Sequence, residues 1–107
     1  MQPEEKIRRL LEAREALGDR VRLAVALYLS VRGKARFKEV SDGLGISSGN
    51  LAHHLRKLEE AGYVDIKKSL DDLRTRILSL TPTGICALAE FLFNLREAEG
   101  SQAGQRE

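Results

Sequence analysis

The chain has 107 residues, of which 42% are hydrophobic and 32% charged, a composition typical of one globular domain and not of a disordered protein. Its single cysteine excludes an internal disulfide and a multi-cysteine metal cage. We see no apolar run of the roughly 18 residues that a membrane span needs and no secretory signal, so we expect a cytoplasmic protein with no membrane partner.

Positive charge is concentrated in the middle of the chain, although the formal net charge is only +2. Residues 32–76 contain ten Lys and Arg against seven acidic side chains, whereas residues 77–107 contain two against four. A local excess of cations is typical of a segment that contacts nucleic acid. The middle of the chain is therefore where we look for a binding surface.

The first two predicted elements are helices that meet near Gly18. The first has an apolar stripe at Ile7, Leu10, Leu11 and Leu17. We expect this N-terminal helix, residues 1–18, to pack on the domain or on a partner chain. Asp19 is a good N-cap for a second helix that runs to about Arg32. Because the second helix is apolar nearly all round, we expect it to be buried nearly all round.

A short helix, a tight turn and a longer helix follow the connector 34–36. Phe37, Val40 and Leu44 mark the short helix, Gly45 lies in the turn, and Ser47 is a good N-cap for the helix that ends near Gly62. This order is typical of a helix-turn-helix. In the longer helix, one face carries Leu51, Leu55 and Leu58, and the opposite face carries Gly49, Asn50, His53, Arg56, Lys57 and Glu60. A helix with these two faces can insert into the major groove of DNA. Without its neighbours, the same pattern would indicate only an amphipathic helix with a solvent-exposed polar face.

After Gly62 the pattern changes from period 3.6 to period 2. Residues 63–68 and 75–80 predict two strands, joined by a turn at Asp71 and Asp72. A two-stranded hairpin is not stable alone, so we expect it to pack on the helices.

Thr81-Pro82 predicts the start of a last helix, with Thr81 as its N-cap. Its apolar stripe consists of Ile85, Leu88, Ala89, Leu92 and Leu95. We expect the helix to end at Gly100 and residues 100–107 to form a disordered tail.

Two segments of this chain resemble those of a known class of regulator. FKEVSDGLGISSGNLAHHLRKLEEAGYV (37–64) resembles the DNA-reading segment of small bacterial and archaeal regulators of the MarR and ArsR kinds. RTRILSLTPTG (74–84) is similar to their second wing strand, with the Leu-Thr-x-x-Gly step into the dimer helix. The resemblance covers about residues 19–95, although the Cys-x-Cys metal box of metal-sensing ArsR relatives is absent.

The resemblance implies a winged helix-turn-helix fold, mainly α with a small β-hairpin wing. The DNA-binding domain would span residues 19–81, between the N-terminal helix and a C-terminal dimerisation helix at 82–99. Carried over, the groove-facing residues are Ser47, Ser48, Gly49, Asn50, His53, Arg56 and Lys57, and those of the wing are Lys67, Lys68, Arg74 and Arg76. The expected dimerisation residues are Ile7, Leu10, Leu11, Ile85, Leu88, Leu92 and Leu95.

Several of these residues also have a plain structural interpretation. Asn50 and His53 lie one turn apart and suit base edges, but Asn50 is also a capping residue type and His53 is simply exposed. Glycine at position 49 would let the backbone amide approach a phosphate closely. Alternatively, no side chain is needed at this position. His54 lies toward the leucine face, where we expect it packed with a backbone partner. Cys86 is expected to pack, with redox sensing as the alternative.

We therefore expect a homodimeric, sequence-specific regulator that binds double-stranded DNA. We see no catalytic set, phosphate loop or zinc spacing, so we predict no enzyme activity, no cofactor and no metal. Two alternatives remain open: a winged-helix module for protein–protein interaction without DNA binding, and a sequence-neutral architectural DNA binder. An effector ligand stays unknown.

Overall fold

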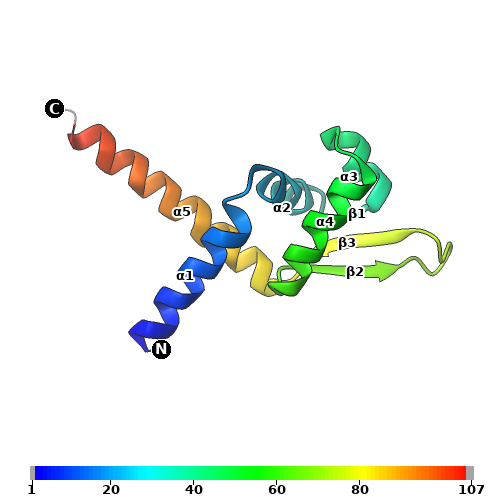
Figure 1. The fold of residues 1–107 in the computed structure, drawn as a ribbon, viewed down its shortest axis with the longest axis horizontal. Coiled ribbons are helices and arrows are strands. Elements are labelled where there is room, and N and C mark those ends of the chain that lie inside the picture. The colour runs from blue at the N-terminus through cyan, green and yellow to red at the C-terminus, as the bar shows by residue number, and fades with distance from the viewer. Residues whose placement is uncertain (1, 106–107) are drawn as a thin grey trace.

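The molecule has a long helix at each end of the chain and a small sheet with three helices between them. The computed structural model describes residues 2–105, with side chains as far as residue 96. Within that range the elements are α1 (Pro3–Leu17), α2 (Arg20–Arg32), β1 (Lys34–Arg36), α3 (Phe37–Leu44), α4 (Ser48–Glu60), β2 (Val64–Lys68), β3 (Arg76–Leu80) and α5 (Pro82–Gln105). Figure 1 shows α1 and α5 at one end of the molecule and the β2–β3 hairpin extending from the other. The predicted fold class is confirmed.

Caps fix the starts of the central helices at the positions that the sequence predicts. Asp19 Oδ1 accepts hydrogen bonds from two backbone N–H groups in the first turn of α2, at 2.9 and 3.0 Å. Ser47 Oγ accepts the backbone N–H of Asn50 at 3.1 Å and begins α4. Gly45 ends α3 with a φ of 66°, a left-handed conformation that disfavours a side chain. The turn between α3 and α4 is therefore specified locally.

The sheet has three strands and not the two that the sequence predicts. β1 pairs antiparallel with β3, and β3 with β2, in the order β1-β3-β2. The predicted connector 34–36 is thus a strand, with Ala35 buried opposite Leu78. Three residues are too few to show an alternating pattern, so only the pairing with a distant strand reveals β1. The third strand supports a hairpin that would be marginal alone.

The leucine face of α4 points into the core, as predicted. Leu51, Leu55 and Leu58 are each at most 1% exposed. They belong to the same core cluster as Val25 and Leu29 of α2, Val64 of β2 and Leu78 of β3. Because burying one leucine contributes roughly 2 kcal/mol, this face fixes the rotation of α4 about its own axis. The opposite face of α4 must then point outward.

Helix α2 is less buried than its composition predicts. Val25, Ala26 and Leu29 are in the core, but Val31 is 84% exposed and Leu27 is also exposed. An apolar pattern shows only that burial would be favourable. A chain of this size has too few elements to cover every side of a helix, so the prediction of near-complete burial is wrong.

Helix α5 continues beyond Gly100, where the sequence predicts its end, and runs to Gln105. The expected disordered tail, residues 100–107, therefore starts inside a helix, and residues 106–107 lie outside the described residues. Glycine in a helix costs only about 1 kcal/mol relative to alanine, which the alanines and glutamines around it can offset. In the described part of the chain, no helix, α5 included, is long and apolar enough to span a membrane.

Candidate nucleic-acid interface

The outward face of α4 presents the polar side chains that the sequence places there. Every predicted groove-facing residue is exposed: Ser47, Ser48, Gly49, Asn50, His53, Arg56 and Lys57. Ser47 is the N-cap, and Asn50 lies inside the helix and supplies only its backbone N–H to that cap. The capping interpretation of Asn50 is therefore wrong, and its side chain stands on the exposed face.

Gly49 has open space around it. A Cβ atom built on Gly49 meets nothing within 4 Å. The fold therefore does not require glycine here, although glycine lowers helix stability by roughly 1 kcal/mol relative to alanine. Open space fits both of the interpretations given above, close approach of a phosphate and the absence of any need for a side chain.

The two neighbouring histidines lie on different sides of α4. His53 is exposed, and its Nδ1 is 3.5 Å from Nη2 of Arg56, one turn further along the helix. His54 is only 8% exposed. Their ring centroids are 5.1 Å apart with an edge-on geometry. His53 is thus available to a ligand of α4, whereas His54 belongs to the packing behind it.

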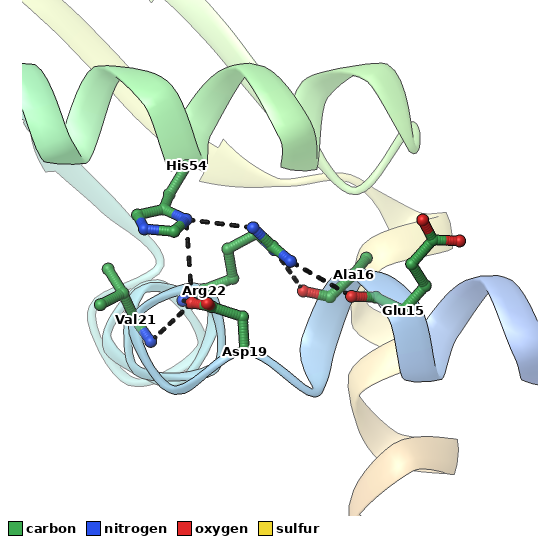
Figure 2. Close-up of polar contacts among 6 residues, drawn as sticks. All are labelled: Glu15, Ala16, Asp19, Val21, Arg22 and His54. Atoms are coloured by element: carbon green, nitrogen blue, oxygen red, sulfur yellow. Dashed lines mark hydrogen bonds and ion pairs between the residues drawn. The ribbon is translucent and has the colours of Figure 1, made fainter.

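His54 takes part in a cluster that joins three helices, drawn in Figure 2. Its Nδ1 lies 3.1 Å from Nη1 of Arg22 and 3.7 Å from Oδ1 of Asp19. Arg22 also donates to the backbone carbonyls of Ala16 and Glu15, at 2.6 and 3.2 Å. The predicted packed histidine is confirmed, but its partners are side chains and not the expected backbone group.

The two titratable members of this cluster have shifted pKa values. Burial is the main cause that lowers the pKa of His54, with the Arg22 and His53 charges acting in the same direction and Asp19 opposing them. The hydrogen bond from the backbone N–H of Arg22 is the main cause that lowers the pKa of Asp19. The cluster therefore favours a neutral histidine beside an ionised aspartate.

The cations of the wing lie along its two strands and the end of its loop. Lys67, Lys68, Arg74 and Arg76 are all exposed. Nζ of Lys67 is 3.5 Å from Oδ2 of Asp65, an exposed pair that contributes little to stability. The guanidinium of Arg76 lies 4.4 Å from the ring centroid of Phe37, so a cation–π contact holds it against the start of α3.

The tip of the wing is apolar and acidic. Leu70 and Leu73 are 96% and 67% exposed. The carboxylate of Asp72 accepts hydrogen bonds from the N–H of Arg74 and the hydroxyl of Thr75, at 3.0 and 3.1 Å. Asp72 thus shapes the turn, as its residue type predicts, and the wing's positive charge lies behind the tip.

Three further exposed cations, which sequence reasoning missed, lie on β1 and at the start of α3: Lys34, Arg36 and Lys38. Lys34 and Arg36 lie on β1, opposite Ser79 and Ile77 of β3. The density of cations in KARFK is the signal that the sequence offers for these residues. This signal can be connected with the wing only once the pairing of β1 with β3 is known.

The Thr81–Gly84 step joins the end of α4 to the start of α5. Thr81 Oγ1 accepts the N–H of Gly84 at 2.9 Å and donates to the carbonyl of Gly62. A Cβ built on Gly84 would lie 2.1 Å from the carbonyl oxygen of Tyr63, so only glycine fits there. The threonine and glycine of the Leu-Thr-x-x-Gly motif are therefore explained by the close backbone contact between the segment after α4 and the start of α5.

The expected dimerisation residues divide into exposed and buried ones. Leu88 is 5% exposed and belongs to the core of one chain, so it is not available to a partner. Leu10 is half-buried, and the rest are exposed: Ile7, Leu11, Ile85, Leu92 and Leu95. Phe93 of α5, absent from the expected set, is exposed as well. Cys86 is exposed near the start of α5, so the expectation that it packs in the core is wrong.

Residues 21–98 match the family model described as a winged helix DNA-binding domain. A protein of Methanocaldococcus jannaschii described as uncharacterized is 33% identical over 76 residues, which cover 70% of this chain and 83% of that protein. The sequence therefore matches the same fold that the coordinates show.

Solved structures with a similar fold include a transcriptional regulator homologue and a protein described as an ArsR family transcriptional regulator. The transcriptional regulator homologue of Pyrococcus horikoshii OT3 is 28% identical with a TM-score of 0.80, and the match covers 92% of this chain and 97% of that one. The transcriptional repressor CouR, solved with a 23-mer DNA duplex, is 25% identical with a TM-score of 0.66, over 81% of this chain and 64% of that one. The resemblance to MarR and ArsR regulators is confirmed.

Proposed function

Because the chain belongs to the family of winged helix DNA-binding domains, we propose that it is a sequence-specific transcriptional regulator that binds double-stranded DNA as a homodimer. The observation that carries the proposal is the orientation of α4. Its leucines are in the core, and its small, polar and cationic side chains are exposed on the other side. A helix of this kind fits the major groove of B-DNA.

Base reading is assigned to Asn50 and His53. An asparagine side chain can pair with adenine through two hydrogen bonds, and a histidine ring can donate or accept one. Both residues are exposed and one turn apart. Gly49 beside them leaves room for a phosphate to approach the N-terminus of α4, where the helix dipole favours negative charge.

Phosphate binding is assigned to the cations around α4. Arg56 and Lys57 lie on α4 itself, and the wing supplies Lys67, Lys68, Arg74 and Arg76. The structure adds the exposed cations of β1 and α3: Lys34, Arg36 and Lys38. Such contacts position a protein on DNA and supply most of its affinity, while base contacts supply specificity.

Dimerisation is assigned to the end of the molecule opposite the wing. Helices α1 and α5 pack on each other there and expose large apolar side chains. Exposed apolar patches are typical of interfaces. A two-fold dimer would place two copies of α4 on half-sites about one helical turn apart, roughly 34 Å.

Selection of bound fragments from a random duplex pool, followed by titration of the selected duplex, tests the proposal. We expect one enriched sequence, with affinity that falls steeply as salt rises. Retention on duplex that is weak and insensitive to salt would favour a protein-interaction module that uses the exposed apolar helices. Equal affinity for selected and random duplex would favour an architectural binder.

A further inference from the structure

Arg22 connects α1, α2 and α4 through one side chain. It lies in the first turn of α2, and its guanidinium donates to the carbonyls of Ala16 and Glu15 at the end of α1, at 2.6 and 3.2 Å. The last carbonyls of a helix have no partner within the helix, so Arg22 caps α1. Its remaining arm reaches His54 on the inner side of α4 (Figure 2).

The contact between Arg22 and His54 defines the protonation state of the histidine. A guanidinium has N–H donors and no acceptor, so Nδ1 of His54, at 3.1 Å, must accept. We assign the neutral ring with its proton on Nε2 on this ground. The carboxylate of Asp19, 3.7 Å from the same nitrogen, also accepts two backbone hydrogen bonds from the start of α2.

We propose that Arg22 is a positioning residue for DNA reading, which acts through neutral His54 to hold α4 at a fixed orientation to α1 and α2. The inference rests on the proposed role of α4 in base recognition. His54 is the neighbour of His53, so a shift of the inner side of α4 displaces the outer side as well. Hydrogen bonds to base edges tolerate little displacement, because they weaken steeply with angle and distance.

Protonation of His54 would break this arrangement. A proton on Nδ1 replaces an acceptor with a donor, so the ring and the guanidinium would repel each other and the ring would turn toward Asp19. The groups that act on the ring are Asp19 and Arg22 from the start of α2 and His53 on α4 itself. Among the side chains that the structure describes, α3 and β2 add no charge that acts on it. The lowered pKa of His54 means that the folded state prefers the neutral ring.

The chain has two histidines, so the two rings can be separated by mutation. In His53→Gln the remaining histidine is His54, and we expect affinity for the selected duplex to fall as the pH drops below about 6.5, by less than tenfold at about pH 5.5 because the pKa of His54 is lowered. Adding His54→Asn, which keeps an acceptor near the position of Nδ1 but does not titrate, should give a flat profile. The same slope in both variants would overturn the role of neutral His54.

Arg22→Lys and Arg22→Gln test the positioning role itself. We expect both to lower the ratio of affinities for selected and scrambled duplex by about tenfold, with the affinity for scrambled duplex unchanged, because phosphate contacts belong to other residues. Arg20→Gln is the matched control, because Arg20 is an exposed cation in the same turn. We expect it to leave the ratio as it is.

Ring ¹⁵N resonances give a readout that needs no DNA. We expect the pKa of His54 to lie below the ordinary histidine value in the wild-type chain and to rise in Arg22→Gln, because a nearby cation is lost. If the Arg22 variants changed neither the ring titration of His54 nor the affinity ratio, the positioning role of Arg22 would be overturned and the proposed function would stand. A wild-type chain that bound no duplex would overturn the proposed function, and the DNA-reading role of Arg22 with it.

Discussion

The two ends of the molecule are both exposed, but they expose different chemistry. At one end, α4, β1 and the strands of the wing present small polar and cationic side chains, although the wing tip exposes two leucines. At the other, α1 and α5 present leucine, isoleucine and phenylalanine side chains. The first end suits a polyanion with hydrogen-bonding edges, and the second suits another apolar surface. Exposure alone therefore does not define a site; the chemistry of the exposed atoms does.

The contacts between the ends matter as much as the ends themselves. Arg22 joins the last turn of α1 to the inner side of α4, and the Thr81–Gly84 step joins the end of α4 to the start of α5. Each contact is short and has little freedom. These two connections join the helical end of the molecule to α4 through hydrogen bonds.

The largest expected effect comes from placing a charge in the apolar end. Leu11→Glu should leave the fold intact, because Leu11 is exposed in one chain, but should raise the dimer dissociation constant about 100-fold, since the carboxylate would lose its water at the interface. Sedimentation equilibrium measures this. Arg14→Glu, also on α1, is the control that changes charge at an exposed polar position. Equal dimerisation by all three proteins would remove α1 from the interface.

The next effect concerns specificity at the polar end. Asn50→Ala should cost about 1–3 kcal/mol on the selected duplex and relax the preference at one base pair, because a bidentate contact to a base edge is lost. Titrations against duplexes substituted at each position in turn will show where the preference is lost. A uniform loss at all positions would mean that Asn50 contacts the backbone instead.

A smaller effect, independent of sequence, is expected from the cations around α4. Lys68→Ala should weaken binding to every duplex alike and lower the slope of log K against log salt by about 0.9. Arg36→Ala should do the same if β1 extends the phosphate-binding surface, as its pairing with β3 indicates. Affinities measured over a salt series test both. An unchanged slope for Arg36→Ala would confine the surface to α4 and the wing.

The smallest expected effects come from Gly49→Ala, which should change the free energy of unfolding and the affinity for DNA in opposite directions. Gly49→Ala should raise the free energy of unfolding by about 0.5–1 kcal/mol, because alanine favours the helix and the added methyl group meets open space. The same change should weaken DNA binding if a phosphate approaches the backbone there. Chemical denaturation and duplex titration of one preparation compare the two effects. A more stable variant with full affinity would leave Gly49 without a role in binding.

Local sequence predicted the central element well, because its signals lie within a few residues of one another. Ser47, the leucine face and the exposed face of α4 are all where the spacing places them. The Thr81 cap and the two wing strands follow for the same reason. Each of these features depends on caps, periodicity or turn residues.

Features that depend on distant contacts could not be predicted in this way. The strand at 34–36 exists because of its pairing with β3, and the burial of Leu88 depends on elements far away in the chain. The partner of His54 is 32 residues away, so no periodicity points to Arg22. The exposure of Val31 likewise reflects how few elements surround α2. These features require the three-dimensional arrangement.

Backbone amide NMR during titration with the selected duplex tests most directly whether the outward face of α4 reads DNA. We expect the largest shift changes at Ser48 to Arg56 and along β2 and β3, with small changes at Leu11 and Leu95. Changes confined to α1 and α5, with α4 and the wing unaffected, would contradict the proposed DNA-reading role of α4.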